Sequence, residues 1–232
     1  MMRFLPSMAL MLVFALPPMA HAQEAAPTLI TVTGESTAQA APDLATVDLG
    51  VTTEAPTAAD ALAANTTAVT AIMDRLSKAG IEGRDIQTSN LSLNPNWSST
   101  ADGTGSVISG YMAMNMLSVR VRDLGKLGTV LDAVVTDGAN TLNGIVFGLQ
   151  DPKPVMGTAR KAAVEDARAR AGELASAAGL TLGRIVSVTE GSAYQAPQPM
   201  YRQASAQDGA VPVAGGEVGM TASVTVVFEA TP

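Results

Sequence analysis

The most restrictive feature of this sequence is that its apolar residues switch repeatedly between a period of two and a helical period. Segments 29–35, 45–52 and 109–122 alternate apolar and polar side chains, whereas the segments that follow each strand pair do not. A period of two is typical of strands with one buried face, and a spacing of three to four residues is typical of amphipathic helices. The pattern therefore predicts a half-buried sheet covered by helices.

Three helices are expected, over residues 57–80, 123–136 and 151–179. Each begins at a Thr or Asp that can cap its first turn, and a glycine follows each apolar stripe. The first stripe consists of Leu62, Val69, Ile72 and Leu76. The third helix instead repeats alanine every fourth residue from Ala159 to Ala175, so this helix can lie very close to a sheet.

The predicted order is β-β-α-β-β-α-β-α-β-β. Strand pairs alternating with helices, without a glycine-rich phosphate loop, favour the α+β class, with a largely antiparallel sheet covered by three helices. Two segments are predicted to be irregular. Residues 94–105, rich in Asn, Ser, Thr and Gly, are expected to form a loop carrying Trp97, and residues 191–217 are expected to form a flexible excursion from a domain spanning 29–230.

The first 22 residues have the organisation of a cleavable secretory signal peptide. Arg3 precedes an apolar run over residues 8–16, and Ala20-His21-Ala22 provides the small residues that a signal peptidase requires. The apolar run is shorter than the roughly 20 residues that span a bilayer. We expect cleavage between Ala22 and Gln23, a short tail over 23–28, no transmembrane segment and a periplasmic location.

Cleavage would also remove the sole histidine, His21, from a chain that has no cysteine. Ser-His-Asp and Cys-His nucleophile systems, thiolate or imidazole zinc sites and disulfides would then be excluded. The formal net charge is −7, without a basic patch for nucleic acid or anionic lipid. We therefore expect a protein that is not an enzyme, binds no cofactor and no nucleic acid, and offers no recognisable small-molecule site.

Three features are candidate sites. Met112, Met114 and Met116 share one strand face, where they can fill an irregular gap, bind Cu(I) or consume oxidant, or form an exposed interface. Because same-face residues lie roughly 6–7 Å apart on a regular strand, the three sulfurs cannot converge on one metal unless the strand bends. Packing is the preferred interpretation.

Arg120 and Arg122 also share a face, before a helix N-terminus, and can act as an anion clamp or form surface or inter-subunit ion pairs. Ion pairing is preferred because Asp123 already caps the helix. Trp97 can serve as an interface anchor or fold back over a helix. Trp97, Arg120 and Arg122 are therefore our candidate interface residues.

The order and spacing of several short segments resemble the SIMPL-domain family of periplasmic proteins. These segments are 30–35, 41–43, 85–88, Tyr111, 119–127, 144–147 and 159–179, and the resemblance that they carry extends over nearly the whole exported chain, about residues 28–230. The resemblance implies an α+β domain, a periplasmic or outer-membrane-associated location, assembly into ring-like or channel-like homo-oligomers and, for some members, defence against oxidative stress. It supplies no catalytic residues. The excursion after Gly191 departs from the family pattern.

Overall fold

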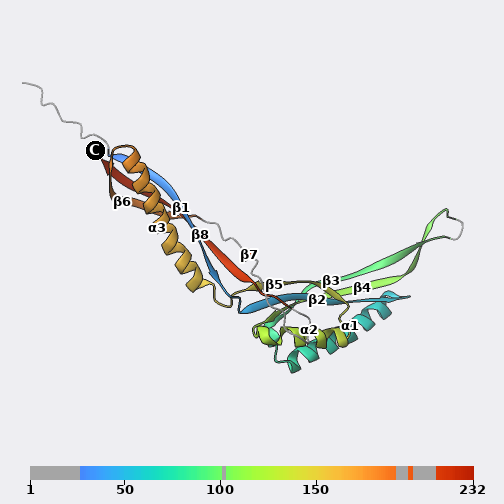
Figure 1. The fold of residues 1–232 in the computed structure, drawn as a ribbon. Helices are drawn as coiled ribbons and strands as arrows, with labels where there is room; N and C mark the ends of the chain where they lie inside the picture. Colours follow the sequence, from blue (N-terminus) through green and yellow to red (C-terminus); the bar gives the residue numbers. More distant parts are fainter. Residues whose placement is uncertain (1–26, 101–102, 192–197, 201–212) are drawn as a thin grey trace, which may run out of the picture.

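The computed structural model describes residues 27–100, 103–191, 198–200 and 213–232. The strands form two separate antiparallel sheets, one covered by a single helix and the other by two, and the molecule is elongated and bent where the two meet (Figure 1). The α+β class with three helices is confirmed. The predicted signal peptide and most of the predicted excursion lie outside the described residues.

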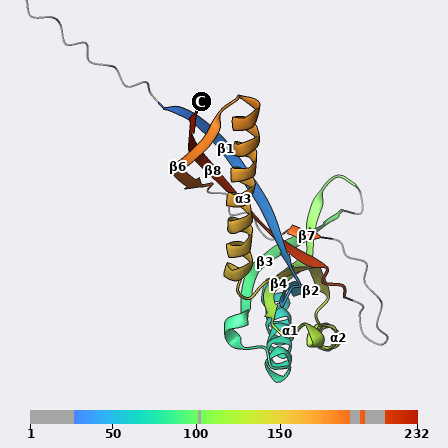
Figure 2. The ribbon, with the colours of Figure 1, turned by 60° about the vertical axis from the view of Figure 1, so that its left-hand side comes forward.

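The terminal lobe contains both ends of the described chain. Its sheet has the order β1-β8-β6, formed by β1 (Thr28–Ala40), β8 (Glu217–Thr231) and β6 (Thr181–Glu190). The short strand β7 (Gln198–Met200) pairs with the beginning of β8. Helix α3 (Lys153–Ala177) lies along one face of this sheet (Figure 2).

The inserted lobe lies between β1 and α3 in the sequence. Its sheet has the order β3-β4-β2-β5. The strands are β2 (Leu44–Ala55), β3 (Ile86–Ser99), β4 (Ser106–Val121) and β5 (Thr141–Gly148). Helices α1 (Ala58–Lys78) and α2 (Leu127–Thr136) cover one face, and no helix of the described residues lies on the opposite face (Figure 1).

Each lobe has its own hydrophobic core. In the terminal lobe, α3 contributes only alanines to the fully buried positions, namely Ala159, Ala163, Ala167, Ala171 and Ala175. In the inserted lobe, branched aliphatic side chains fill the core, among them Val47, Leu49, Ile72, Leu76 and Leu117. The predicted alanine ridge is thus confirmed, and α3 lies so close to β1 that a Cβ added to Gly34 would overlap the backbone of Ala163 and Ala167.

Helix α1 begins as predicted, because the Thr57 hydroxyl accepts a hydrogen bond from the Asp60 N–H. The predicted apolar stripe is wrong at one position. Leu62 is 40% exposed, and the buried face instead contains Ala61 and Asn65 one turn from Val69. A buried asparagine is tolerated here because its amide donates to the Val51 and Ala113 carbonyls of the sheet.

The loop predicted over residues 94–105 is wrong for its first half. Strand β3 continues to Ser99 and pairs with β4 from Ser106 onward, so that residues 100–105 are what is left to connect the two strands. Asn and Ser are disfavoured in strands by propensity alone, but cross-strand pairing with β4 overrides that preference. We call residues 91–100 and 103–110 the arm. From Asn96 on β3 and Gly110 on β4 outward, the arm extends beyond the residues of β4 that pair with β2.

In the part of the chain that the structure describes, no helix is both long enough and apolar enough to cross a bilayer.

Candidate functional site

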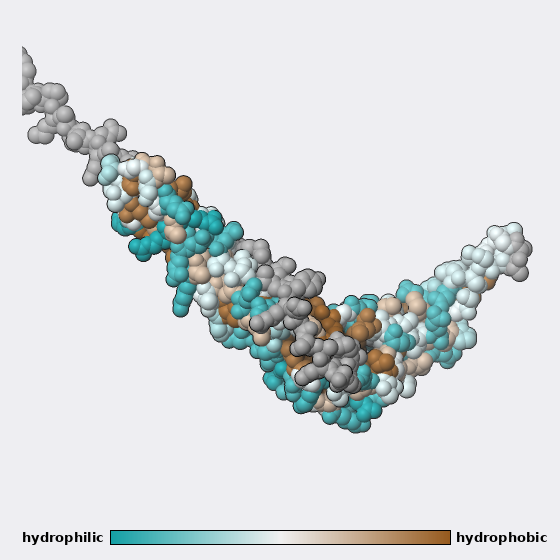
Figure 3. Space-filling model, viewed as in Figure 1, coloured by the Kyte–Doolittle hydropathy of each residue, from teal (hydrophilic) through white to brown (hydrophobic). Residues whose placement is uncertain are grey.

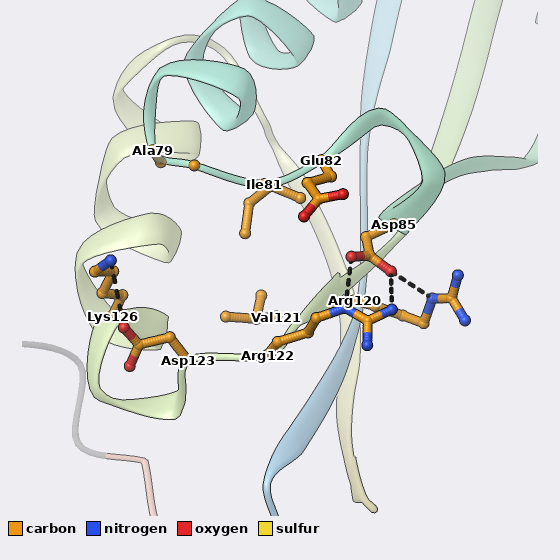
Figure 4. Close-up of a pocket in the computed structure, with 10 residues that line it drawn as sticks. Ala79, Ile81, Glu82, Asp85, Arg120, Val121, Arg122, Asp123 and Lys126 are labelled. Carbon is orange, nitrogen blue, oxygen red and sulfur yellow. Dashed lines mark hydrogen bonds and ion pairs between the residues drawn. The ribbon is translucent and has the colours of Figure 1, made fainter. Parts of the chain in front are cut away.

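A charged cluster lies where β3 begins and β4 ends. A 3₁₀ turn (Gly83–Asp85) follows α1, and the pairing of Ile86 with Val119 sets Asp85 opposite Arg120 across the two strands. Asp85 is the one charged residue that is buried among the described residues, at 4% exposure. Figure 4 shows its carboxylate facing both Arg120 and Arg122.

Both carboxylate oxygens of Asp85 accept hydrogen bonds from arginine. Arg122 donates from Nε to Oδ2 at 2.7 Å and from Nη2 to Oδ1 at 2.8 Å, and Arg120 Nε lies 3.2 Å from Oδ1. The hydrogen bond from Arg122 lowers the pKa of the Asp85 carboxyl below its ordinary value, although burial opposes that change. Asp85 is therefore held as a carboxylate, and both of its oxygens already accept hydrogen bonds from arginine.

A shallow cavity of about 210 Å³ lies beside the cluster. Its walls carry both signs of charge, with Glu82 and Asp123 facing Lys126 and the two arginines, while Ile81 and Val121 line its apolar part (Figure 4). Lys126 and Asp123 pair with each other at 3.3 Å. The arrangement is suited to holding the end of the sheet together.

The cluster continues into the junction between the lobes. Arg122 Nη1 also donates to the Gln150 side chain at 3.3 Å, and Gln150 is bound to Asp43 twice. The Gln150 N–H donates to the Asp43 carboxylate at 2.7 Å, and the Gln150 amide donates to the Asp43 carbonyl at 2.8 Å. Asp43 lies on the segment that enters the inserted lobe and Gln150 on the segment that leaves it, so these bonds tie the two crossings together.

A third segment reaches the same junction. Residues 213–216 lead into β8, and Val213 packs against the core of the inserted lobe. A Cβ atom added to Gly215 would lie 3.0 Å from Pro42 Cγ and 3.5 Å from Phe147 Cδ1. Glycine is therefore the residue that fits between these neighbours.

The methionine face lies on the side of the inserted sheet that has no helix. Met116 is 4% exposed, and its sulfur occupies the space above Gly50, where an added Cβ would lie 2.5 Å from it. Met112 and Met114 are half-buried. Strand β4 pairs with β2 without a register shift over this stretch, so the three methionines keep the spacing of alternate residues on one strand.

Trp97 lies on the arm rather than in a loop. It pairs across the strands with Ile108, and it is 62% exposed. Its neighbours Leu91 and Leu93 are 58% and 42% exposed. The structure therefore does not fold Trp97 back over a helix; it presents the indole on an exposed apolar surface.

Sequence reasoning found Arg120 and Arg122 but missed their partner. Both arginines pair with Asp85 of the same chain, which sequence reasoning did not link to them. The signal available was the strand alternation, since Asp85 stands one residue before β3 and the two arginines stand at the end of β4. Only the register between these strands brings the three residues together.

Together these features define a two-lobed α+β protein whose lobes are joined by a network of charged and amide side chains. The chain belongs to the SIMPL family, because residues 30–228 match the family model described as "Protein of unknown function (DUF541)".

Similar proteins come from several bacteria. The 26 kDa periplasmic immunogenic protein of Brucella melitensis biotype 1 is 40% identical over 227 residues, which cover 93% of this chain and 91% of that protein. The uncharacterized protein YggE of Escherichia coli K12 is 32% identical over 209 residues, covering 88% and 83%. The similarity therefore extends across both lobes.

Proposed function

We propose that this protein is exported to the periplasm and acts there without catalysis, as a self-assembling structural or stress-protective module. The observation that carries the proposal is the arm. Its large apolar side chains are exposed along the hairpin, and its outer end, beyond the residues that pair with β2, packs against no helix of the described residues. Figure 1 shows this end extending away from α1. These side chains are Leu91, Leu93, Trp97, Val107 and Ile108.

The composition of the hairpin supports a contact made by side chains. Between Asp85 and Arg120, the sequence contains a single charged residue, Asp102. Exposed apolar side chains that gather on one element, such as the paired Trp97 and Ile108, mark interaction sites, and tryptophan is enriched among the residues that dominate binding energy. Proline is tolerated in a strand where its missing N–H faces away from the partner strand, so Pro95 interrupts the free edge of β3. We therefore assign the contact to the apolar side chains and not to strand addition at this edge.

Light scattering coupled to size-exclusion chromatography tests the assembly. The purified exported chain should elute as one discrete species several times heavier than a monomer at micromolar concentration. Trp97→Ala should shift the population toward lighter species because truncation removes the largest exposed side chain of the arm. Val135→Ala, at a residue of α2 that is 59% exposed, is the matched control and should leave the mass unchanged. A monomeric wild-type protein would contradict the proposal.

The periplasmic location is supported by the leader-like first 22 residues and by the relative that is named a periplasmic protein. Mass spectrometry of protein released from the periplasm of the source bacterium should find Gln23 as the first residue. Retention of the first 22 residues in a cytoplasmic fraction would overturn this part of the proposal.

The stress-protective part is carried by the family resemblance. A deletion strain should survive peroxide less well than the wild type, and the intact protein should restore survival while the Trp97→Ala protein should not. Equal restoration by both proteins would separate stress protection from assembly. Survival of the deletion strain at the wild-type level would contradict the stress role.

A soft-metal or oxidant-buffering role is the alternative, and it is favoured by the partial exposure of Met112 and Met114 on a face without a helix. It predicts uptake of Cu(I) in a defined ratio that is lost when Met112, Met114 and Met116 are all replaced by Leu. Met73→Leu, at a methionine of α1 that is 45% exposed, is the control. Unchanged Cu(I) affinity in the triple variant would reject this alternative.

A further inference from the structure

The outer edge of β1 is a free strand edge among the described residues, because β8 pairs with β1 on one side only. The direction of its backbone groups follows from one bond. The Glu35 N–H donates to the Asp166 carboxylate of α3 at 2.9 Å, so it points away from β8. Residues of the same parity behave alike in an antiparallel pair, and the close contact of the Thr33 and Thr225 hydroxyls at 3.1 Å agrees with this assignment.

The N–H and C=O groups of Leu29, Thr31 and Thr33 therefore face outward. The next outward-facing N–H along β1 is that of Glu35, and it is already bound to Asp166, so the free edge ends there. What is left is a short stretch that carries no charged residue from Thr28 to Gly34. Charged side chains are a common protection of free edges, and this one has none.

A groove of about 470 Å³ runs beside the same stretch of β1. It is bounded by Val32 and Thr33 of the strand and by Leu174 and Ala177 of α3, with Arg170 and Glu173 at its rim. Leu174 is 52% exposed. A strand added to β1 would place alternate side chains in this groove beneath α3, as peptides do when they extend a sheet.

We propose that β1 pairs antiparallel with β1 of a second copy of this chain, about a two-fold axis that passes through Thr31. This inference deepens the proposed self-assembly and rests on it. In this register Thr31 faces Thr31 of the second copy and Leu29 faces Thr33, so every outward-facing group of the stretch finds a partner. The outward-facing residues Leu29, Thr31 and Thr33 are symmetric about Thr31, and the free edge ends at Glu35, where Asp166 accepts its N–H.

The charges at the rim of the groove fit a second copy. A two-fold contact joins one patch to itself, so the patch must be self-complementary. Arg170 and Glu173 lie one turn apart on α3, and rotation by 180° brings the positive part of one rim toward the negative part of the other. Arg170 pairs with Asp166 in the same helix at 2.9 Å, whereas Glu173 has no ion-pair partner within the described ranges.

The opposite edge of this sheet is less suited to pairing. Strand β6 changes register with β8 twice, around Ile185, and Arg184 is paired with Glu229 next to the irregular stretch. Bulges of this kind twist an edge away from an incoming strand. The regular edge of β1 is therefore the surface that we assign to the second copy.

Because the chain has no cysteine, single-cysteine variants test this register directly. Thr31→Cys should form a covalent dimer with a short bifunctional thiol reagent, because paired residues of adjacent strands lie about 5.5 Å apart between Cα atoms. Thr37→Cys, on the same face of β1 but beyond Asp166, is the matched control and should remain monomeric on a denaturing gel. A mixture of Leu29→Cys and Thr33→Cys chains should cross-link more than either variant alone.

Charge reversal gives a second readout. Arg170→Glu should weaken dimerisation about tenfold, and the addition of Glu173→Arg should restore it, while circular dichroism confirms that α3 stays folded in both.

Equal cross-linking of Thr31→Cys and Thr37→Cys would overturn the register. Light scattering that shows oligomers without cross-linking at Thr31 would overturn this contact and leave assembly through the arm standing, whereas a monomer without cross-linking would overturn both. A Thr31→Cys adduct with a different polypeptide would assign the edge to a foreign strand and also reject the proposal.

Discussion

In both lobes a helix packs against a sheet, but the side chains at the contact are small in one lobe and large in the other. In the terminal lobe, α3 lies against β1 through alanines, and a Cβ on Gly34 would lie only 2.7 Å from the Ala167 Cβ and would overlap the backbone of Ala163. In the inserted lobe, α1 is held away from its sheet by Val69, Ile72 and Leu76. Close-packed interiors respond to both added and removed volume, so the lobes should fail in opposite ways.

The difference also bears on surface chemistry. Close approach lets Asp166 of α3 reach the Glu35 N–H at the edge of β1 and protect part of that edge. The inserted lobe leaves one face of its sheet without a helix, and Figure 3 shows hydrophobic side chains gathered on the concave side of the bend, toward that lobe. The helix position in each lobe thus decides which part of its sheet remains accessible.

The largest effect is expected from loss of volume in the inserted lobe. Ile72 is fully buried, and Ile72→Ala should lower the free energy of unfolding by about 2–5 kcal/mol because it leaves a cavity. Met73→Ala, at the adjacent exposed position, should change it by less than about 0.5 kcal/mol. Urea denaturation followed by circular dichroism measures both, and equal effects would contradict the packing of α1.

Added volume should damage the terminal lobe. Gly34→Ala should cost about 1–3 kcal/mol or more, because its new methyl group meets the backbone of α3 and not a flexible side chain. Gly172→Ala in α3 is the control, since, apart from the backbone of the helix itself and the neighbouring residues, no described heavy atom lies within 4 Å of its Cβ position. That control should stabilise the protein by about 0.5–1 kcal/mol through helix propensity. A neutral Gly34→Ala variant would mean that α3 does not approach β1 so closely.

The next effect concerns the charged cluster at the junction of the lobes. Asp85→Asn should lower the free energy of unfolding by about 1.5–3 kcal/mol at neutral pH, because it weakens hydrogen bonds from two arginines. The folded-state pKa of Asp85 is lowered, so its contribution is present above the ordinary carboxyl pKa and is lost as the pH falls through the lowered value.

The destabilisation caused by Asp85→Asn should therefore shrink in acid. Asp123→Asn, at a side chain that is 61% exposed, is the control and should have little effect at either pH. A pH-independent difference between wild type and Asp85→Asn in urea denaturation would show that the carboxylate charge is not what stabilises the junction.

The smallest effect concerns one amide. The Glu35 N–H should exchange slowly with solvent at neutral pH, and Asp166→Ala should speed its exchange while leaving the amides of β8 unaffected. The bond from Glu35 lowers the pKa of Asp166, so in the wild type the protection should fade as the pH falls through that lowered pKa. Exchange rates from NMR, corrected for intrinsic pH dependence, test this prediction. Unchanged exchange in Asp166→Ala would contradict the protection of the Glu35 N–H by Asp166 at the edge of β1.

Much of the fold follows from periodicity and capping. The Thr57 cap, the alanine ridge of α3 and the alternation of β4 are all predicted from local patterns and all appear in the structure. The division into two sheets could not be predicted, because alternation shows that a strand has one buried face but not which strands pair. That choice is made by the crossings at residues 41–43 and 149–152, where the chain passes between lobes.

The site was harder to predict for the same reason. Arg120 and Arg122 were recognisable, but Asp85 joins them only through the register of β3 with β4. The polar neighbours of Trp97 predict a loop, whereas pairing with Ile108 keeps it in a strand. Gly34 stood within a recognised segment, yet its role depends on a helix more than 120 residues away in the sequence, since Ala163 and Ala167 are the residues that it meets.

The central claim is that the arm is covered when the protein assembles, and Trp97 reports on it directly as the only tryptophan of the chain. Trp97 is 62% exposed in the isolated chain, so the emission of a dilute monomer should lie at long wavelength. On raising the concentration, the emission should shift to shorter wavelength over the same range in which light scattering detects assembly. Emission that stays at long wavelength while the molar mass rises would contradict the account, because the arm would then remain in water within the oligomer.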